Sequence, residues 1–290
     1  MEHSYANDDT GNLILLEHVN LKIPNQILAT AFYVTGLGLT RDPFVMTGVE
    51  NMWINIGRSQ IHLPHGAAQR LRGSVGLVVG ELEALVTRLR SVEPLLAGTE
   101  FGWKERGGSI EVTCPWGNRY ECLDPAGRSA SAPWSNIDLG IAFVKMDVPV
   151  GSALPIARFY RDMFNAPVDI EEQRGLHRAV IEVGTHQQLL YAETTEPIPE
   201  YDGHHIAIYT AAFSEPYRRL DGKGLVYAEE PHQYRFADLV DLSSGERCFR
   251  LEHEVRSLHH PLYARPLVNR NPEQTNRHYL KGADSRGGRF

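Results

Sequence analysis

Histidines at strand-like positions are the residues of this sequence most able to do chemistry. His18 lies in residues 13–23, where polar and apolar side chains alternate from Leu16 onward. A period of two is typical of a strand that packs one face on a core and presents the other. Imidazole can bind a metal ion or transfer a proton near pH 7. His62 and His205 fall at matching positions of other strand-like segments, which favours a functional role for His18 over that of an ordinary half-exposed histidine.

A carboxylate and two tyrosines extend this set of candidates. Glu252 belongs to the run Leu-Glu-His-Glu-Val-Arg at residues 251–256, which could equally form a salt-bridged edge strand. Tyr191 and Tyr209 lie in segments that we expect to be strands. A tyrosine hydroxyl can donate a proton to a bound oxygen, although packing is the more common use of this side chain.

Length and composition limit the class of protein. A chain of 290 residues is expected to form about two domains, and its 42% hydrophobic residues suffice for packed cores. No apolar run approaches the ~20 residues that cross a bilayer, and the polar, acidic start is unlike a signal peptide. A net charge of −7 argues against nucleic-acid binding. Three cysteines without metal-type spacing predict a reducing, cytoplasmic location.

The chain contains an internal repeat. Residues 13–123 are expected to form a strand, a helix and three strands, twice in succession. The run at 30–33 reappears at 157–160, and the run at 53–57 reappears at 180–184 with the same offset. The expected organisation is therefore a flexible leader (1–12), an N-terminal domain (13–125), a linker (126–137), a C-terminal domain (138–255) and an extended tail (256–290).

Four motifs resemble the vicinal-oxygen-chelate superfamily, which contains glyoxalase I, the extradiol dioxygenases and the fosfomycin and bleomycin resistance proteins. They are Leu-Glu-His-Val-Asn-Leu (16–21), Phe-Tyr-Val-Thr-Gly-Leu-Gly-Leu (32–39), Gly-Asn-Arg-Tyr-Glu-Cys-Leu-Asp-Pro (117–125) and Gly-His-His-Ile-Ala-Ile (203–208). The resemblance implies an α+β fold of four βαβββ modules in two tandem domains, whose mixed sheets curl into cups around a metal. Four modules in one chain is the arrangement of the extradiol dioxygenases and their hydroquinone-cleaving relatives.

In this superfamily the metal ligands come from the first, fourth, fifth and eighth strands of a cup. If each cup uses modules of one domain, His18, His62 and Glu121 would form a site. If the halves are swapped between domains, His18 and His62 would meet His205 and Glu252. We favour the swapped arrangement, because it gathers three histidines and a carboxylate in one cup. The other cup would then hold a poor ligand set, namely Phe143, Leu189, Ser74 and Glu121.

The last strand departs from the family pattern. Counting four residues past Gly245 leads to Phe249, and alternation places Arg250, Glu252 and Glu254 on one face. Arg250 could therefore occupy the position of the expected glutamate, where it would bind a substrate carboxylate.

The resemblance implies a metal-dependent, extradiol-type dioxygenase that acts on a small phenolic or hydroquinone-like substrate. His18, His205 and Glu252 would hold Fe(II) or Mn(II), while His62, Tyr191 or Tyr209 would move protons. A fourth ligand, His62, would instead favour Zn, Ni or Co and a glyoxalase-type lyase or isomerase. A third alternative is a non-enzymatic protein that binds small aromatic molecules. No nucleic-acid or membrane partner is expected, and a homo-oligomer is compatible with the sequence.

Overall fold

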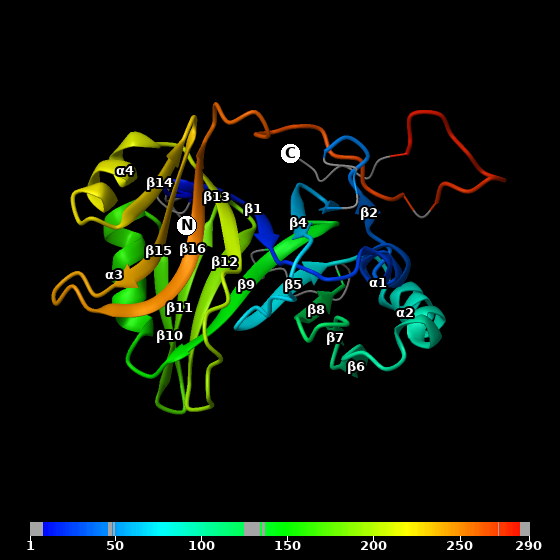
Figure 1. Cartoon of the computed structure of the whole chain (residues 1–290), viewed down its shortest axis with the longest axis horizontal. Coiled ribbons are helices and arrows are strands. Elements are labelled where there is room, and N and C mark those ends of the chain that lie inside the picture. The colour runs from blue at the N-terminus through cyan, green and yellow to red at the C-terminus, as the bar shows by residue number, and fades with distance from the viewer. Residues whose placement is uncertain are drawn as a thin grey trace, which may run out of the picture.

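The chain folds into four βαβββ modules, as the computed structural model shows (Figure 1). The structure describes residues 8–45, 48, 50–124, 134, 137–271 and 273–284. The first module comprises β1 (Leu13–Asn20), α1 (Gln26–Ala29), the π-helical η2 (Thr30–Gly36), β2 (Thr40–Arg41), β3 (Asn51–Ile56) and β4 (Ser59–Pro64). The second comprises β5 (Gly73–Val78), α2 (Leu82–Leu96), β6 (Gly102–Arg106), β7 (Ser109–Thr113) and β8 (Arg119–Leu123).

The second half of the chain repeats this order. Its third module comprises β9 (Gly140–Pro149), α3 (Ala153–Phe164), β10 (Val168–Gln173), β11 (Leu176–Val183) and β12 (Gln187–Thr194). The fourth comprises β13 (His205–Thr210), α4 (Ser214–Asp221), β14 (Val226–Glu230), β15 (Gln233–Val240) and β16 (Arg247–Ser257). The predicted α+β class and its four modules are confirmed.

Two eight-stranded sheets join modules from opposite halves of the chain. The first sheet has the order β14-β15-β16-β13-β1-β4-β3-β2 and combines the first and fourth modules. The second sheet has the order β10-β11-β12-β9-β5-β8-β7-β6 and combines the second and third modules. The swapped pairing favoured from the sequence is therefore confirmed. The predicted boundary between the halves falls outside the described residues, apart from Trp134 and Ile137.

The helices cover the outer faces of the sheets. In α3, the buried residues Ile156, Phe159, Tyr160 and Met163 recur every three or four positions and form one apolar stripe. The helix ends at Asn165, whose left-handed φ of 52° is typical of a C-terminal cap. Figure 1 shows α3 and α4 together at one end of the molecule and α1 and α2 at the other.

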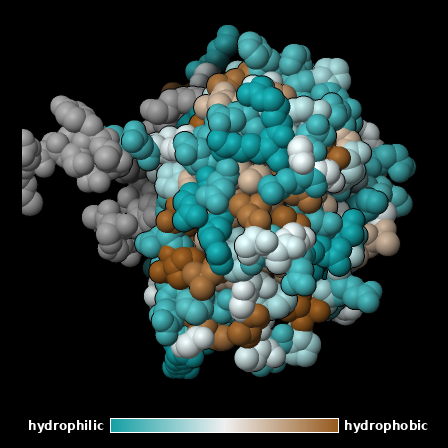
Figure 2. Space-filling model, turned by 90° about the vertical axis from the view of Figure 1, so that its left-hand side faces the viewer, coloured by the Kyte–Doolittle hydropathy of each residue, from teal (hydrophilic) through white to brown (hydrophobic). Residues whose placement is uncertain are grey.

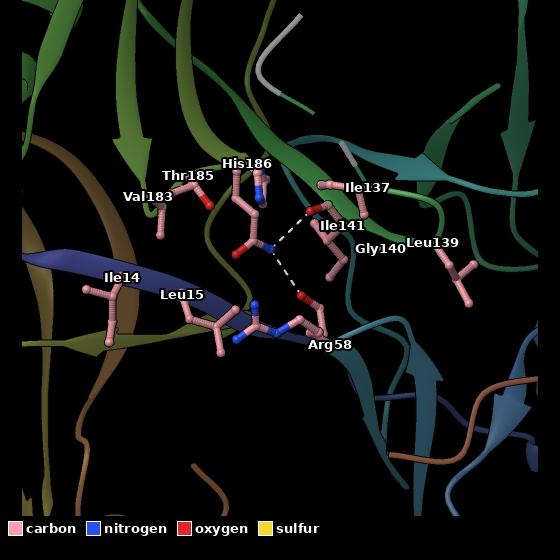
Figure 3. Close-up of a pocket in the computed structure, with 12 residues that line it drawn as sticks. Ile14, Leu15, Arg58, Ile137, Leu139, Gly140, Ile141, Val183, Thr185 and His186 are labelled. Carbon is pink, nitrogen blue, oxygen red and sulfur yellow. Dashed lines mark hydrogen bonds between the residues drawn. The ribbon is translucent and has the colours of Figure 1, made fainter. Parts of the chain in front are cut away.

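A buried glutamine connects the two sheets. Gln187, at the start of β12, donates to the carbonyl oxygens of Leu16 and Ile141 and to Ser59 Oγ, all at 3.0 Å. Its side-chain oxygen accepts from the backbone N–H of Leu16 at 2.9 Å. These bonds reach β1 and β4 of the first sheet and β9 of the second, beside a small cavity of about 50 Å³ (Figure 3). A buried side chain with this many partners fixes the relative position of the sheets.

The C-terminal tail crosses over the first sheet after β16 (Figure 1). Asn55 Nδ2 donates to the carbonyl of Val268, and Asn269 Nδ2 donates to that of Gly57, each at 2.8 Å. Arg265 forms an ion pair of 2.6 Å with the buried Asp42. The predicted extended tail is thus anchored to β3 and the β3–β4 turn, while residues 285–290 lie outside the described part.

The molecular surface in Figure 2 is largely hydrophilic, with hydrophobic patches scattered between polar residues. Single exposed apolar side chains are normal on a soluble surface and require no partner. Within the described ranges, no helix combines the length and apolar character needed to span a membrane.

Candidate metal centre

We call the concave face of the first sheet the cup. A β-bulge in β1 determines which side chains of that strand meet there. The register of β1 against β13 shifts between Leu16 and His18, so that Glu17 is the extra residue. In a regular strand, neighbouring side chains point to opposite faces. The bulge instead brings Glu17 and His18 into direct contact, as bulges near functional sites often do.

His18 presents one bare ring nitrogen to the cup. Its Nδ1 lies 2.8 Å from Glu17 Oε2, and because an ionised carboxylate only accepts, Nδ1 carries the proton. Burial alone would raise the pKa of Glu17, but the hydrogen bond from His18 and the charge of Arg256 hold this pKa below its usual value. The Nε2 atom is buried and has no hydrogen-bond partner among the described residues. Metal-binding histidines usually show this arrangement, with a carboxylate behind the ring.

His205 and Glu254 converge on the same point as His18. One ligand atom from each of the three side chains lies within 4.8 Å of the other two. The ring centroids of His18 and His205 are 5.8 Å apart, and His205 Nε2 is 3.7 Å from Glu254 Oε2. Burial, aided by the nearby His18 and Arg235, lowers the pKa of His205. Its imidazole is therefore neutral, which is the form that ligates metals.

Two arginines complete the charge balance of this cluster. Arg235, on β15, forms ion pairs of 2.6 Å with both Glu252 and Glu254. Arg256 pairs with Glu17 and with the other oxygen of Glu254. Three carboxylates thus surround two guanidinium groups beside the imidazoles of His18 and His205. This donor set fits a divalent cation.

Glu254, and not the predicted Glu252, lies level with His18. In the β13–β16 ladder Glu254 pairs with Ala207, and in the β1–β13 ladder Ala207 pairs with His18. Glu252 lies one same-face position away, opposite His205, with its Oε1 3.5 Å from His205 Nδ1. Arg250 lies a further position away and is half exposed near Asp238. The ligand role predicted for Glu252 thus stays a prediction, and the geometry favours Glu254.

The internal repeat could have identified Glu254 as a candidate ligand from the sequence, because Glu254 is the counterpart of Glu121. In the second sheet, Gly76 lies between Phe143 of β9 and Glu121 of β8, as Ala207 lies between His18 and Glu254 in the first. Glu121 and Glu254 are therefore equivalent positions. Counting from Gly245 missed this, because β15 and β16 contain two register shifts that alter the spacing.

The cup of the second sheet has an aromatic ring at the equivalent place. Phe143 lies so close over Gly76 that a Cβ atom there would be 2.3 Å from the ring. Glu121 belongs to this sheet, whereas His18 and His62 belong to the first. The unswapped ligand set of His18, His62 and Glu121 is thus divided between two sheets.

His62 lies in the cup but uses both ring nitrogens elsewhere. Its Nδ1 accepts from Asn20 Nδ2 at 2.6 Å, and its Nε2 donates to Asn51 Oδ1 at 2.7 Å. The ring stacks on Trp53 with centroids 3.8 Å apart. Burial, together with the nearby charges, lowers the pKa of His62 to about 2. Because both ring nitrogens of His62 are bonded to amides, the ring offers no donor atom as a fourth ligand, and an ion would keep open positions.

The two predicted tyrosines lie in different places. Tyr209 lies on β13 opposite Leu15, on the cup side, and its ring packs 5.0 Å from that of Tyr263 in the tail. Burial and the charge of Glu17 raise its pKa, so the hydroxyl keeps its proton. Tyr191 belongs to the second sheet, where its hydroxyl lies 2.5 Å from that of Tyr160 in the core. Tyr209 thus lies on the same strand as His205, whereas Tyr191 lies in the core of the other sheet, and the roles predicted for both stay predictions.

Solved structures share this architecture. Glyoxalase I from Zea mays is similar over 83% of this chain and 92% of its own, with 13% identity and a TM-score of 0.57. A proposed dioxygenase from Bacillus subtilis is similar over 85% of this chain and 86% of its own, with 13% identity and a TM-score of 0.56. No protein-family model and no curated sequence matches the chain. The similarity shows the fold, at identities too low to assign an activity.

Proposed function

We propose that this chain, which has the fold of the vicinal-oxygen-chelate superfamily, is a metal-dependent oxygenase of the extradiol type that acts on a small phenolic substrate. The observation that carries the proposal is the convergence of His18, His205 and Glu254 in the centre of the cup. Two histidines and one carboxylate with open positions are the usual ligand set of non-haem Fe(II) oxygenases.

Each residue of the cup has a defined part in this proposal. His18 Nε2, a ring nitrogen of His205 and an oxygen of Glu254 would hold the ion, and Glu17 orients His18 through its hydrogen bond. When bound, Fe(II) or Mn(II) would supply a Lewis-acidic centre that brings a phenolic substrate and O₂ together. The protonated hydroxyl of Tyr209 is the proposed proton donor.

One observation favours a rival function. Both oxygens of Glu254 already have guanidinium partners, Arg235 and Arg256. If these ion pairs persist, the cup holds no ion and acts as a polar binding site for small aromatic molecules. The position of His18 argues for the metal, because its buried Nε2 otherwise has no hydrogen-bond partner in the part of the chain that the structure describes.

Metal analysis separates these functions. We expect the purified protein to contain stoichiometric iron or manganese and to consume O₂ with catechol or hydroquinone. The variants His18→Ala, His205→Ala and Glu254→Gln should each lose the metal. Glu252→Gln is the matched control on the same strand, and it should retain the metal because Glu252 lies outside the cluster of ligand atoms.

Two other results would contradict the proposed ligands or the proposed reaction. A wild-type protein without bound metal, or metal retained in Glu254→Gln but lost in Glu252→Gln, contradicts the proposed ligand set. Turnover that persists without O₂ would point to a glyoxalase-type reaction in the same cup.

A further inference from the structure

A cleft lined by arginines lies between parts of both sheets. Its volume is about 700 Å³, and it is open to solvent. Pro149, at the end of β9, contributes from the second sheet, and residues 247–250 of β16 contribute from the first. Residues 198–201, before β13, and Arg72, directly before β5, form further parts of the lining. The cleft is thus built from four segments that are far apart in the sequence.

Arg72 is a buried cation in the wall of this cleft. Only 9% of the residue is exposed, and its Nε atom is buried without a hydrogen-bond partner among the described residues. Its Nη2 atom donates to the carbonyl of Arg250, but no carboxylate in the described ranges forms an ion pair with the guanidinium. Burial lowers the pKa of Arg72, and the nearby Tyr201 and Asp202 offset this only in part. Because arginine keeps its charge in proteins, a buried guanidinium without an anionic partner is costly.

Two aromatic rings hold the side chain of Arg72 in position. Its guanidinium carbon lies 4.1 Å from the ring centroid of Phe249 and 5.0 Å from that of Tyr201. The Tyr201 hydroxyl donates to the carbonyl of His204 at 2.6 Å and accepts from the N–H of Glu252 at 3.1 Å, so this ring is itself fixed. A guanidinium that is positioned by aromatic faces keeps N–H donors for a ligand.

Two further arginines line the same cleft. Arg247 and Arg250 are half exposed, and both lie near one carboxylate oxygen of Asp238, at 3.6 and 3.7 Å. These distances exceed those of hydrogen bonds, so two guanidinium groups share this carboxylate loosely. Of the lining residues that the structure describes, only Glu200 is acidic. The side chains of the cleft therefore favour an anion over a cation.

We propose that this cleft binds a small organic anion whose carboxylate or phosphate group pairs with Arg72, Arg247 and Arg250. The planar fork of arginine can donate two parallel hydrogen bonds to either group. Ile198 and Pro199 in the same lining fit an apolar body on the ligand. The volume lies within the range of about 300–1,000 Å³ that is usual for small-molecule sites. This inference does not depend on the proposed function, because none of the three proposed metal ligands lines the cleft.

Calorimetric titration of the full-length chain tests the site. The probes are benzoate, which carries a carboxylate, phenyl phosphate, and benzyl alcohol as a neutral analogue. We expect at least one anion to bind with a Kd of about 1 mM or less, and benzyl alcohol to bind about tenfold more weakly or not at all. The anion that binds more tightly identifies the preferred head group. Removal of metal by a chelator, followed by dialysis, should leave the Kd unchanged.

Three outcomes of these titrations overturn the inference. They are binding of neither anion in this range, binding of benzyl alcohol as tight as that of the anions, and anion binding that is lost when the metal is removed. The last of these would place the anion on a metal ion and not on the arginines.

Substitutions locate the binding in the cleft. Arg72→Gln should weaken binding of the preferred anion about tenfold or more, because it removes the buried guanidinium. Arg90→Gln is the matched control and should bind as the wild type does, since Arg90 also lies over a ring, 5.7 Å from that of Trp103, but outside the cleft. Thermal melting shows whether the variants are folded. If Arg72→Gln does not fold, the double variant Arg247→Gln/Arg250→Gln at half-exposed positions takes its place, with the same expected loss. A folded cleft variant with the affinity of the wild type overturns the inference.

Discussion

His62 shows how much of the cup is polar scaffold around the ligands. Its ring connects the amides of Asn20 and Asn51 and stacks on Trp53. Buried amides are stable only when they have hydrogen-bond partners. The residue that the sequence proposed as a ligand or acid–base group therefore contributes to the wall that positions its neighbours.

Replacement of His62 by phenylalanine tests this role. His62→Phe keeps the stack on Trp53 but removes one hydrogen bond each from the amides of Asn20 and Asn51, so we expect a loss of about 1–3 kcal/mol in the free energy of unfolding, measured by urea denaturation. Metal content should stay that of the wild type. His65→Phe is the control, since the side chain of His65 is 52% exposed. Loss of metal without loss of stability would show that His62 is a ligand.

At the scale of the elements, a buried glutamate holds the start of α3. Glu193 Oε1 accepts from the backbone N–H groups of Gly151 and Ala153, and Oε2 accepts from that of His177. Burial raises the pKa of Glu193, but the hydrogen bonds outweigh it and hold this pKa below the usual value. The carboxylate thus links β12 to the helix N-terminus and to β11.

The stabilisation by Glu193 should depend on pH. Because the pKa is lower in the folded than in the unfolded state, the contribution is present above the unfolded pKa and is lost as the pH falls through the folded pKa. We expect Glu193→Gln to lose about 2 kcal/mol in the free energy of unfolding at pH 7, and the difference from wild type to shrink toward pH 3. Urea denaturation at both pH values measures this. A difference that does not change with pH would assign the effect to packing alone.

At the scale of the whole molecule, the swapped sheets make each half of the chain incomplete. The central pairs β1–β13 and β5–β9 both join strands from different halves. A half alone would leave the edges of β1 and β5, or of β9 and β13, without partners. Unpaired strand edges are open to aggregation or to pairing with another chain.

Separate expression of the halves tests the swap. We expect residues 1–125 and 138–290 to be unfolded or aggregated when each is expressed alone, and to form a soluble one-to-one complex when they are co-expressed. Size-exclusion chromatography and circular dichroism measure both outcomes. Two separate, stably folded monomers would show that the sheets do not require strands from both halves.

The sequence by itself determined the modules and the fold class. Alternation of polar and apolar residues in β1 and the repeat of residues 30–33 at 157–160 are local patterns, and local periodicity decides which segments form strands and helices. The fold, the swapped pairing and the cup that holds His18 and His205 were all predicted from these patterns with the family resemblance.

Only the tertiary structure decided which side chains meet at one point. The bulge at Glu17 and the pairing of β13 with β16 bring Glu254 level with His18. The partners of His62 come from β1 and β3. A shift of one residue moves a side chain to the other face of a strand, and this register depends on contacts between segments far apart in the sequence. Composition and spacing therefore identified the strands, while strand register selected the ligands.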